Sequence, residues 1–215
     1  MKFGWTPEAE ILNSRLANAW FYHCCWDLCH NWPNYSWSMV MRREQYQVPQ
    51  VEFVFREDGE FVTRSSAELF NGKRVIIFSL PGAFTPTCSA YQLPGFESTY
   101  DEFAAFGIDE IYCISVNDGF VMNAWAKDQG IEKVKLIPDG NAYFTRCMGQ
   151  LVSKSNLGFG ERSWRYAAVV NDGIIEKLFE EEGKCDNGGG DPYYETTPEA
   201  VFRYVSSAVK VGATA

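Results

Sequence analysis

A single cysteine stands at the end of a stiff turn in the segment "LPGAFTPTC", residues 80–88. The residues before it, Lys73–Ser79, contain the apolar run "VIIF" and predict a buried strand. Pro81 and Pro86 restrict the backbone between that strand and Cys88. We therefore expect the thiol to be held in a fixed position at the end of a strand, where a helix begins.

The chemistry open to Cys88 depends on its thiolate, which is the reactive form of cysteine. Free N–H groups and the partial positive charge at a helix N-terminus stabilise an anion. Thr85 precedes Cys88 by three residues, so on a first helical turn its hydroxyl would meet the reaction partner of the sulfur. The residues alone allow two interpretations, a reactive thiol and a buried structural cysteine, because free cysteine is among the most buried residue types.

The order of the predicted elements places Cys88 at the edge of a sheet. Apolar runs predict two further strands, Asp109–Val116 and Val134–Ile137, and the turn "NDG" joins Tyr166–Val170 to Ile174–Phe179 in a hairpin. Strands that alternate with helices predict an α/β fold, with a central mixed β-sheet and helices on both faces. Sites in open α/β sheets form at the carboxyl ends of strands, which is where Cys88 lies.

Capping and turn residues predict the flanking elements. Before the apolar strand, Val51–Phe55 and Glu60–Thr63 predict a hairpin, and a Ser65–Glu68 capping box predicts a helix that ends at Gly72. After Cys88, we expect a helix from Ser89 to Gly107 that is kinked at Pro94, and then a helix capped by Asn117 or Asp118.

Two more helices are expected further along the chain. One runs from "PDG" through Met148, and the last is capped by Thr197 with Pro198 at its first position.

Several separated segments resemble one known family. "PGAFTPTC" matches the Pro-x-x-x-Thr-x-x-Cys signature of peroxiredoxins. Four further runs agree in order and spacing: "LPGF" (93–96), "CISVNDGFVMNAWAKD" (113–128), "IPDGNAYFTRCMG" (137–149) and "LGFGERSWRYAAVVNDG" (157–173). From Gln47 to Val209 the chain resembles type-5/type II peroxiredoxins, including the peroxiredoxin domain of bacterial peroxiredoxin–glutaredoxin hybrids. The resemblance implies a thioredoxin-like fold and a thiol-dependent peroxidase that reduces hydrogen peroxide and organic hydroperoxides.

The resemblance also implies roles for individual residues. Cys88 would be the peroxidatic cysteine, which becomes a sulfenic acid, and Pro81 and Thr85 would complete the signature. The active-site arginine of the family falls on Arg165, and its neighbour Arg162 is the second candidate. No cofactor and no metal are implied.

The chain departs from the family at Gln92, where the subfamily commonly has a histidine. No histidine occurs in residues 47–209, so an arginine and the helix terminus must favour the thiolate. Lowering the pKa of a thiol from about 8.5 to about 6 raises its thiolate fraction about 30-fold, but lowers its nucleophilicity about 10–20-fold. Because these effects nearly cancel, we expect polarisation of the peroxide by Thr85 and Arg165 to be the larger contribution.

The remaining cysteines suggest how the enzyme is recycled. Cys113 lies within an apolar strand and Cys147 on a short helix, and neither is expected to react. Cys185, in "EEGKCDNGGG", is either a resolving thiol or incidental. Without it, glutathione with glutaredoxin, or thioredoxin, would reduce the sulfenic acid.

Two other functions remain as alternatives. A thiol–disulfide oxidoreductase on the same fold is disfavoured, because residues 85–88 read T-x-x-C and not C-x-x-C. The other is a redox-responsive binding or holdase protein that uses the aromatic N-terminal segment.

Composition limits the partners and the compartment. The 215 residues are 46% hydrophobic and suit one domain with a real core. A net charge of −9 argues against nucleic acid or an anionic membrane as a partner. No segment has the ~20 apolar residues that span a bilayer, and residues 1–10 do not have the basic start of a signal peptide. With seven cysteines and no need of a disulfide scaffold, a cytoplasmic location is expected. The resemblance to peroxiredoxins further implies a homodimer.

Residues 1–40 differ from the rest of the chain. They hold five of the seven tryptophans and both histidines. We expect a boundary between an N-terminal extension, residues 1–40, and a peroxiredoxin domain, residues 41–215. The extension is either upstream of the natural start or an aromatic appendage. Its candidate metal ligands, His23, Cys24, Cys25, Cys29 and His30, crowd into eight residues, which disfavours a closed tetrahedral site.

Overall fold

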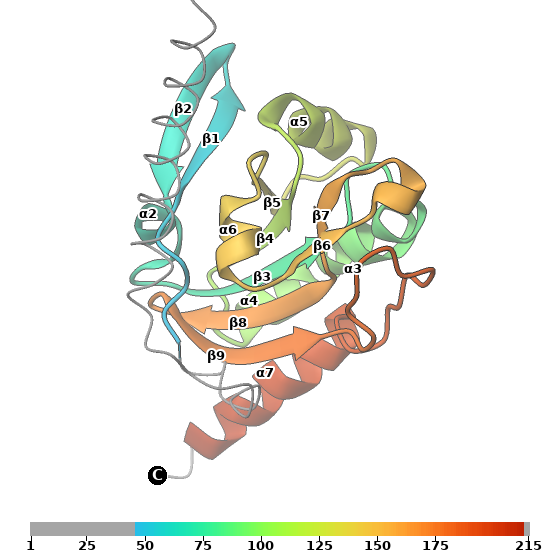
Figure 1. Ribbon diagram of the computed structural model, residues 1–215. Coiled ribbons are helices and arrows are strands. Elements are labelled where there is room, and N and C mark those ends of the chain that lie inside the picture. Colours follow the sequence, from blue (N-terminus) through green and yellow to red (C-terminus); the bar gives the residue numbers. More distant parts are fainter. Residues whose placement is uncertain (1–45, 213–215) are drawn as a thin grey trace, which may run out of the picture. The chain divides into compact units, whose positions relative to one another are not determined.

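The computed structural model of the protein describes residues 46–212, with side chains through residue 208 (Figure 1). The elements in chain order are β1 (Glu52–Glu57), β2 (Glu60–Ser65), α2 (Ser66–Phe70), β3 (Arg74–Leu80), η2 (Cys88–Gln92), α3 (Leu93–Ser98), α4 (Tyr100–Ala105), β4 (Glu110–Ser115), α5 (Gly119–Asp128), β5 (Lys135–Pro138), α6 (Tyr143–Cys147), β6 (Leu151–Ser153), η3 (Ser155–Leu157), β7 (Glu161–Ser163), β8 (Tyr166–Asn171), β9 (Ile174–Glu180) and α7 (Pro198–Gly212).

The central sheet has five strands in the order β5-β4-β3-β8-β9 (Figure 1). Strands β3, β4 and β5 are parallel, whereas β8 and β9 are antiparallel to their neighbours. The predicted mixed sheet is therefore confirmed, and β3 is its middle strand.

Alternate side chains of β3 enter two separate hydrophobic clusters, one on each face of the sheet. Ile76 and Phe78 join a cluster with residues of α3, α4, α5 and α7. Val75 and Ile77 join a second cluster with residues of β1, α2 and α6. This period of two is what a strand buried on both faces requires, and it confirms helices on both faces.

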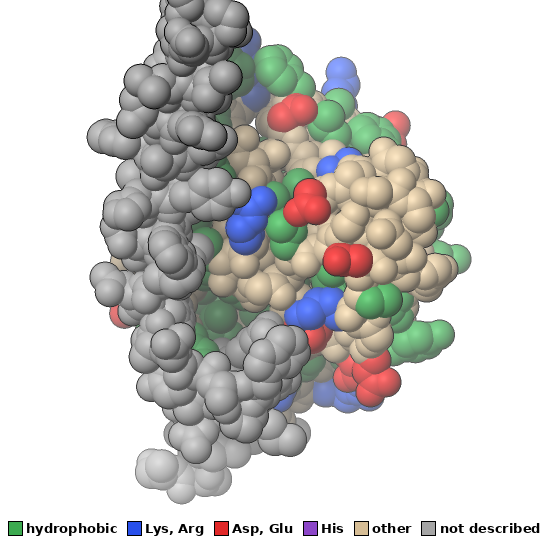
Figure 2. Space-filling view, viewed as in Figure 1, with side chains coloured by type: hydrophobic (Ala, Val, Ile, Leu, Met, Phe, Trp, Pro, Cys, Tyr) green, Lys and Arg blue, Asp and Glu red, His purple; other side chains and the backbone are tan. Residues whose placement is uncertain are grey.

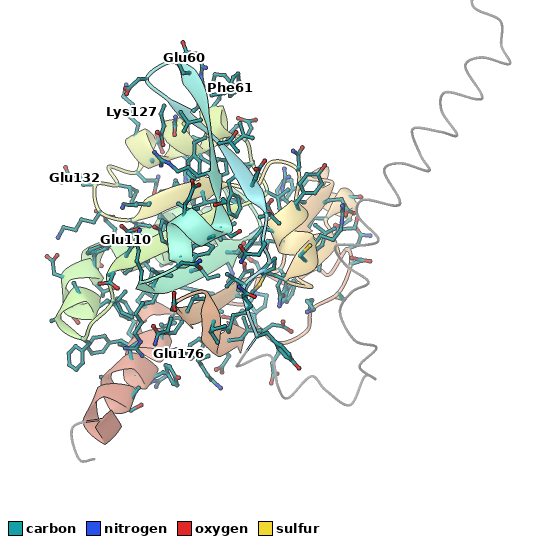
Figure 3. All side chains as sticks on the ribbon, turned by 90° about the vertical axis from the view of Figure 1, so that its left-hand side faces the viewer. Glu60, Phe61, Glu110, Lys127, Glu132 and Glu176 are labelled. Atoms are coloured by element: carbon teal, nitrogen blue, oxygen red, sulfur yellow. The ribbon has the colours of Figure 1, made fainter. Side chains whose placement is uncertain are left out.

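A separate hairpin, β1–β2, stands beside the central sheet. Glu52 to Glu57 pair with Ser65 to Glu60, and Figure 3 shows Glu60 and Phe61 at the tip of this hairpin. The same view places Glu110 away from the hairpin tip, at the amino end of β4. That end of β4 is opposite to the carboxyl edge at which Cys88 follows β3.

Most predicted caps are present. Ser65 and Glu68 form the capping box, and Thr197 Oγ1 accepts a hydrogen bond from the Ala200 N–H at 3.2 Å. Of the two candidate caps for α5, Asp118 is used, because its Oδ1 accepts from the N–H groups of Phe120 and Val121.

The predicted single helix from Ser89 to Gly107 is wrong in its internal structure. It consists of a π-helical turn (η2), then α3 and α4, which are separated at Thr99. Pro94 lies in the first turn of α3, directly after the wider π turn. Because proline has no N–H and displaces the carbonyl four residues earlier, the wider turn accommodates it where a continuous α-helix would not.

Three short elements were not predicted: β6, β7 and η3. Strands of three residues show no period, and β6 and β7 are held together by pairing across the chain, from Leu151 with Ser163 to Ser153 with Glu161. The predicted strand at residues 134–137 is displaced by one residue, to Lys135–Pro138.

Residues 1–40 and their candidate metal ligands lie outside the described residues, so the predicted boundary stays a prediction. Between residues 46 and 212 no group of three or more metal-ligating side chains comes together. In the same range, no helix has the length and apolar character needed to cross a bilayer.

We predict that a chain beginning at Met41 folds cooperatively and retains full peroxidase activity. The expectation rests on both hydrophobic clusters, which are built from residues 48–205. Urea unfolding and steady-state activity, compared with those of the 215-residue chain, measure this. A loss of either property would move the boundary.

Candidate active site

Cys88 and Arg165 lie at the same edge of the sheet because β3 and β8 are antiparallel. Ser79, next to last in β3, pairs with Tyr166, the first residue of β8. Arg165 therefore lies directly before β8 and beside the segment that leads from β3 to Cys88.

The segment after β3 is fixed by hydrogen bonds from a neighbouring strand end. Asn117, just beyond the carboxyl end of β4, accepts from the Ala83 N–H at 3.0 Å and from the Ser115 hydroxyl at 2.7 Å. The Thr85 hydroxyl donates to the Gly82 carbonyl at 2.8 Å. Asn117 thus anchors the turn, and Thr85 closes it.

A helical turn begins at Thr85 and contains Cys88. The Ser89 N–H donates to the Thr85 carbonyl at 3.0 Å, and Pro86 occupies the first turn, where its missing N–H has no partner to lose. Phe84, just before, has a φ of +60°. That conformation is uncommon for a residue with a side chain, and strained positions of this kind cluster at functional sites.

The guanidinium of Arg165 connects the sulfur to two other polar side chains. Its Nη1 lies 3.6 Å from Cys88 Sγ and also donates to Gln92 Oε1. Its Nη2 forms an ion pair with Asp191 Oδ1 at 2.5 Å. The aromatic ring of Tyr193 lies 5.5 Å from the guanidinium carbon. Arg165 is 1% exposed and Cys88 is fully buried, so the contact between the guanidinium and the sulfur is shielded from water, whereas the Asp191 side chain is 43% exposed.

The charge on Arg165 is stable despite its burial. Burial by itself would lower the pKa of Arg165, but the attraction of the Cys88 sulfur and of the Asp191 carboxylate raises that pKa above its ordinary value.

A second buried cysteine, Cys113 in β4, is the register partner of Phe78 and lies in the same hydrophobic cluster as Cys88. Burial and the nearby Cys88 raise the pKa of Cys113 well above its ordinary range, so Cys113 is a neutral thiol in the core.

The structure brings Cys88 and Arg165 together, Pro81 and Thr85 lie in the turn that leads to Cys88, and the second arginine candidate contacts a different group. Arg162 donates through Nη1 to the Val116 carbonyl at 3.0 Å. Its role is to tie the edge of β7 to the end of β4, beside the turn.

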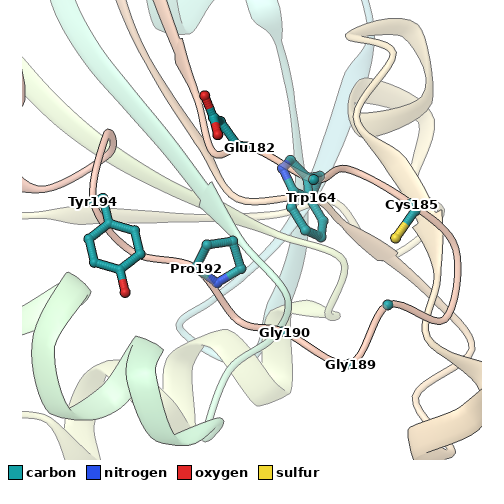
Figure 4. A pocket seen from close by; sticks show the side chains of 9 residues that line it. Trp164, Glu182, Cys185, Gly189, Gly190, Pro192 and Tyr194 are labelled. Carbon is teal, nitrogen blue, oxygen red and sulfur yellow. The ribbon is translucent and has the colours of Figure 1, made fainter.

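Cys185 precedes Asp191 by six residues. It is exposed and lines a hollow of about 430 Å³ together with Trp164 and Tyr194 (Figure 4). Cys88 does not line this hollow.

Asn117, Asp191 and Tyr193 are site residues that the sequence did not reveal, and Gln92 was noted only as a departure from the family. Asn117 follows a buried strand at the functional edge of the sheet, which is a signal that could have found it. Asp191 and Tyr193 lie in a glycine-rich segment without periodicity, and nothing local indicates that they reach Arg165.

Glu181 closes the segment that carries Asp191 and Tyr193. Its Oε1 accepts from the N–H groups of Tyr194, Glu195 and Thr196 and from the Thr196 hydroxyl, at 2.8–3.0 Å. Its own N–H donates to the Arg165 carbonyl at 3.3 Å. The two ends of the segment therefore meet next to Arg165.

We predict that Glu181→Ala lowers the free energy of unfolding by about 2–4 kcal/mol, because four donors, two of them on the buried Thr196, lose their shared acceptor. Glu182→Ala is the matched control, since Glu182 is exposed. Urea denaturation of both variants measures the difference, and equal effects would contradict this role of Glu181.

Taken together, the site holds one nucleophilic sulfur and one fixed cation, both buried, and one hydroxyl in the turn before the sulfur. Such an arrangement can attack a small polar molecule and stabilise negative charge on the atom that leaves.

Comparison with known proteins agrees with this chemistry. Residues 46–190 match the Redoxin family. The chain is 57% identical over 166 residues to a peroxiredoxin of Rhizobium etli, covering 73% of this chain and 93% of that protein. It is 47% identical over 163 residues to the hybrid peroxiredoxin hyPrx5 of Haemophilus influenzae, covering 76% of this chain and 66% of that protein.

A solved structure of reduced Prx3 from Vibrio vulnificus in complex with H2O2 superimposes with a TM-score of 0.69 at 33% identity, covering 75% of this chain and 98% of that one. The family match extends over more than half of the chain, and the Rhizobium etli relative is covered almost entirely. The chain belongs to the Redoxin family and is a peroxiredoxin, a thiol-dependent peroxidase.

Proposed function

We propose that Cys88 is the peroxidatic cysteine and that Arg165 and Thr85 polarise the peroxide it attacks. The observation that carries this proposal is the 3.6 Å approach of Arg165 Nη1 to Cys88 Sγ, with both groups buried. A neutral structural thiol would not require a buried cation beside it, since burying a charge is costly unless the charge is compensated.

In the proposed step, the Cys88 thiolate attacks the nearer oxygen of the hydroperoxide. The S–O bond forms as the O–O bond breaks, the attacked oxygen keeps its hydrogen so that the sulfur is oxidised to a sulfenic acid, and the other oxygen takes a proton from solvent and leaves as water or an alcohol. Negative charge grows on the departing oxygen, and Arg165 is the fixed donor that stabilises it.

Thr85 would contribute through its hydroxyl, which faces the turn. Its hydrogen bond to the Gly82 carbonyl fixes the position of the oxygen, so that its lone pairs can accept a hydrogen bond from the peroxide. The turn is set by Asn117 before substrate arrives, and such preorganisation lowers the barrier because no group has to be reoriented.

We predict that Thr85→Val lowers kcat/KM for hydrogen peroxide about 10–100-fold through the loss of one positioned polar group. Thr85→Ser keeps the hydroxyl and is the matched control. Stopped-flow measurement of the reaction with peroxide tests both variants. A Thr85→Val enzyme as fast as the parent would exclude Thr85 from the reaction.

For the reductant, we propose glutathione with glutaredoxin, with thioredoxin as the alternative. This follows the resemblance to peroxiredoxin–glutaredoxin hybrids, and it fits Cys185 being exposed while Cys88 is buried. Such reductants are maintained in a reducing compartment, which supports a cytoplasmic location.

We also propose a homodimer. Phe84 and Tyr91, in the active-site turn and in η2, are 52% and 64% exposed, and exposed aromatic side chains suit an interface.

On the face in Figure 2, the acidic and basic side chains of the described residues are interspersed and do not gather into a basic patch. This distribution supports the proposal that nucleic acid is not a partner.

Steady-state peroxide consumption with each reductant in turn tests the proposed cycle. We expect turnover with reduced glutathione plus glutaredoxin, with hydrogen peroxide and with organic hydroperoxides. We expect Cys185→Ser to turn over at the rate of the parent. Turnover that is abolished in Cys185→Ser would instead assign Cys185 as a resolving thiol.

A further inference from the structure

Asp191 shares the guanidinium of Arg165 with the Cys88 sulfur. The carboxylate binds Nη2 at 2.5 Å, and the sulfur lies 3.6 Å from Nη1. The Asp191 side chain is 43% exposed, whereas that of Arg165 is 1% exposed. One buried cation thus has two acidic neighbours, of which only the carboxylate keeps its charge when the sulfur is oxidised.

The balance of charge at Arg165 must change during the reaction described under Proposed function, on which this inference rests. In the proposed step Cys88 reacts as a thiolate, and that negative charge faces the Arg165 guanidinium. Once the sulfur has become a sulfenic acid that keeps the hydroperoxide proton, that compensation is lost. A buried cation left without a counter-ion strongly destabilises the folded state.

We infer that Asp191 is a positioning residue that keeps Arg165 buried and aligned when Cys88 is oxidised. Gln92 Oε1 accepts from Nη1 and Asp191 Oδ1 from Nη2, so both arms of the guanidinium are held. A planar guanidinium bound at both arms cannot rotate about its own axis. Asp191 therefore supplies both a fixed acceptor and a charge that persists through the cycle.

Hydrogen bonds on both sides hold the glycine-rich run that carries Asp191. Before it, the Asn187 N–H donates to the Ser153 carbonyl at 2.7 Å, and Lys154 Nζ donates to the Gly188 carbonyl at 3.3 Å. After it, Glu181 binds the backbone from Tyr194 onward. The position of Asp191 is therefore imposed by the fold and does not depend on its ion pair alone.

A double-mutant cycle in the full chain tests the role of the charge. Cys88→Ser removes the thiolate, because a serine hydroxyl does not ionise at neutral pH. Asp191→Asn removes the carboxylate charge and keeps an oxygen in place. We expect Asp191→Asn to raise the equilibrium constant for unfolding about tenfold more in Cys88→Ser than in the parent, since only there does it leave Arg165 uncompensated.

The control for this cycle is Asp186→Asn in the same segment, whose carboxylate accepts from the Ser153 N–H at 2.7 Å and does not contact Arg165. Its effect on unfolding should be equal in the two backgrounds. Additive effects of Asp191→Asn and Cys88→Ser in urea denaturation would overturn the role of the charge.

The rate of the reaction with peroxide tests the positioning. We expect Asp191→Ala to lower the second-order rate constant about tenfold, and Asp191→Asn, which restores the acceptor oxygen, to recover it to within about threefold of the parent. Equal rates for Asp191→Ala and the parent would overturn the positioning role while leaving the proposed function in place. A parent enzyme that does not react with peroxide would instead overturn the proposed function itself.

Discussion

Cys88→Ser should abolish peroxide reduction and leave the fold intact. A serine hydroxyl fits the space of the thiol, but it is a far weaker nucleophile and does not ionise at neutral pH. The loss should be complete in steady-state turnover and in the single reaction with peroxide, and the far-ultraviolet circular dichroism spectrum should match that of the parent.

Cys113→Ser is the matched control, because Cys113 is equally buried, lies in the same hydrophobic cluster and is a neutral thiol. Any variant at this position perturbs packing but leaves the nucleophile in place. Activity that survives in Cys88→Ser and disappears in Cys113→Ser would show that the wrong sulfur had been chosen.

Arg165→Met should lower kcat/KM for peroxide about 30- to 1000-fold. This corresponds to a loss of about 2–4 kcal/mol of transition-state stabilisation, the effect of losing one preorganised donor. Methionine is close in length to arginine and removes the charge together with all five N–H donors. If Arg165 acts on the transition state, the deficit should persist at high pH, where the thiol is ionised without help. Stopped-flow rates measured across pH decide this point.

Arg162→Met provides the comparison for Arg165→Met. Arg162 lies beside the same turn but donates to the Val116 carbonyl and not to the sulfur, so a modest effect is expected. An Arg165→Met enzyme that regains the parent rate at high pH would restrict Arg165 to favouring ionisation of the thiol.

The parts of the site that the sequence predicted are local ones. Pro81, Thr85 and Cys88 lie within eight residues, and the strand before them is marked by its apolar run, so their relation follows from local geometry. Arg165 was found through the family resemblance. The antiparallel pairing of β3 with β8 explains physically why a residue 77 positions away from Cys88 reaches its sulfur.

The parts that the sequence did not predict depend on contacts made only in the folded chain. The ion pair of Asp191 with Arg165 joins residues 26 positions apart, and the hydrogen bond of Ala83 to Asn117 joins residues 34 positions apart. The position of Asn117 after a buried strand marks the residue but does not identify its partner, and no local signal marks Asp191. The break at Thr99 is of the same kind, since α3 and α4 are oriented by packing of Phe96 and Phe103 into one cluster.

The central claim is that Cys88 Sγ is the atom that peroxide oxidises, and trapping of the product tests it most directly. The reduced full chain is treated with one equivalent of hydrogen peroxide in the presence of dimedone, a reagent that captures sulfenic acids, and its peptides are mapped by mass spectrometry. We predict a single dimedone adduct on the peptide that contains Cys88, and none on that peptide in Cys88→Ser. An adduct that forms on another cysteine while Cys88 stays unmodified would contradict the assignment.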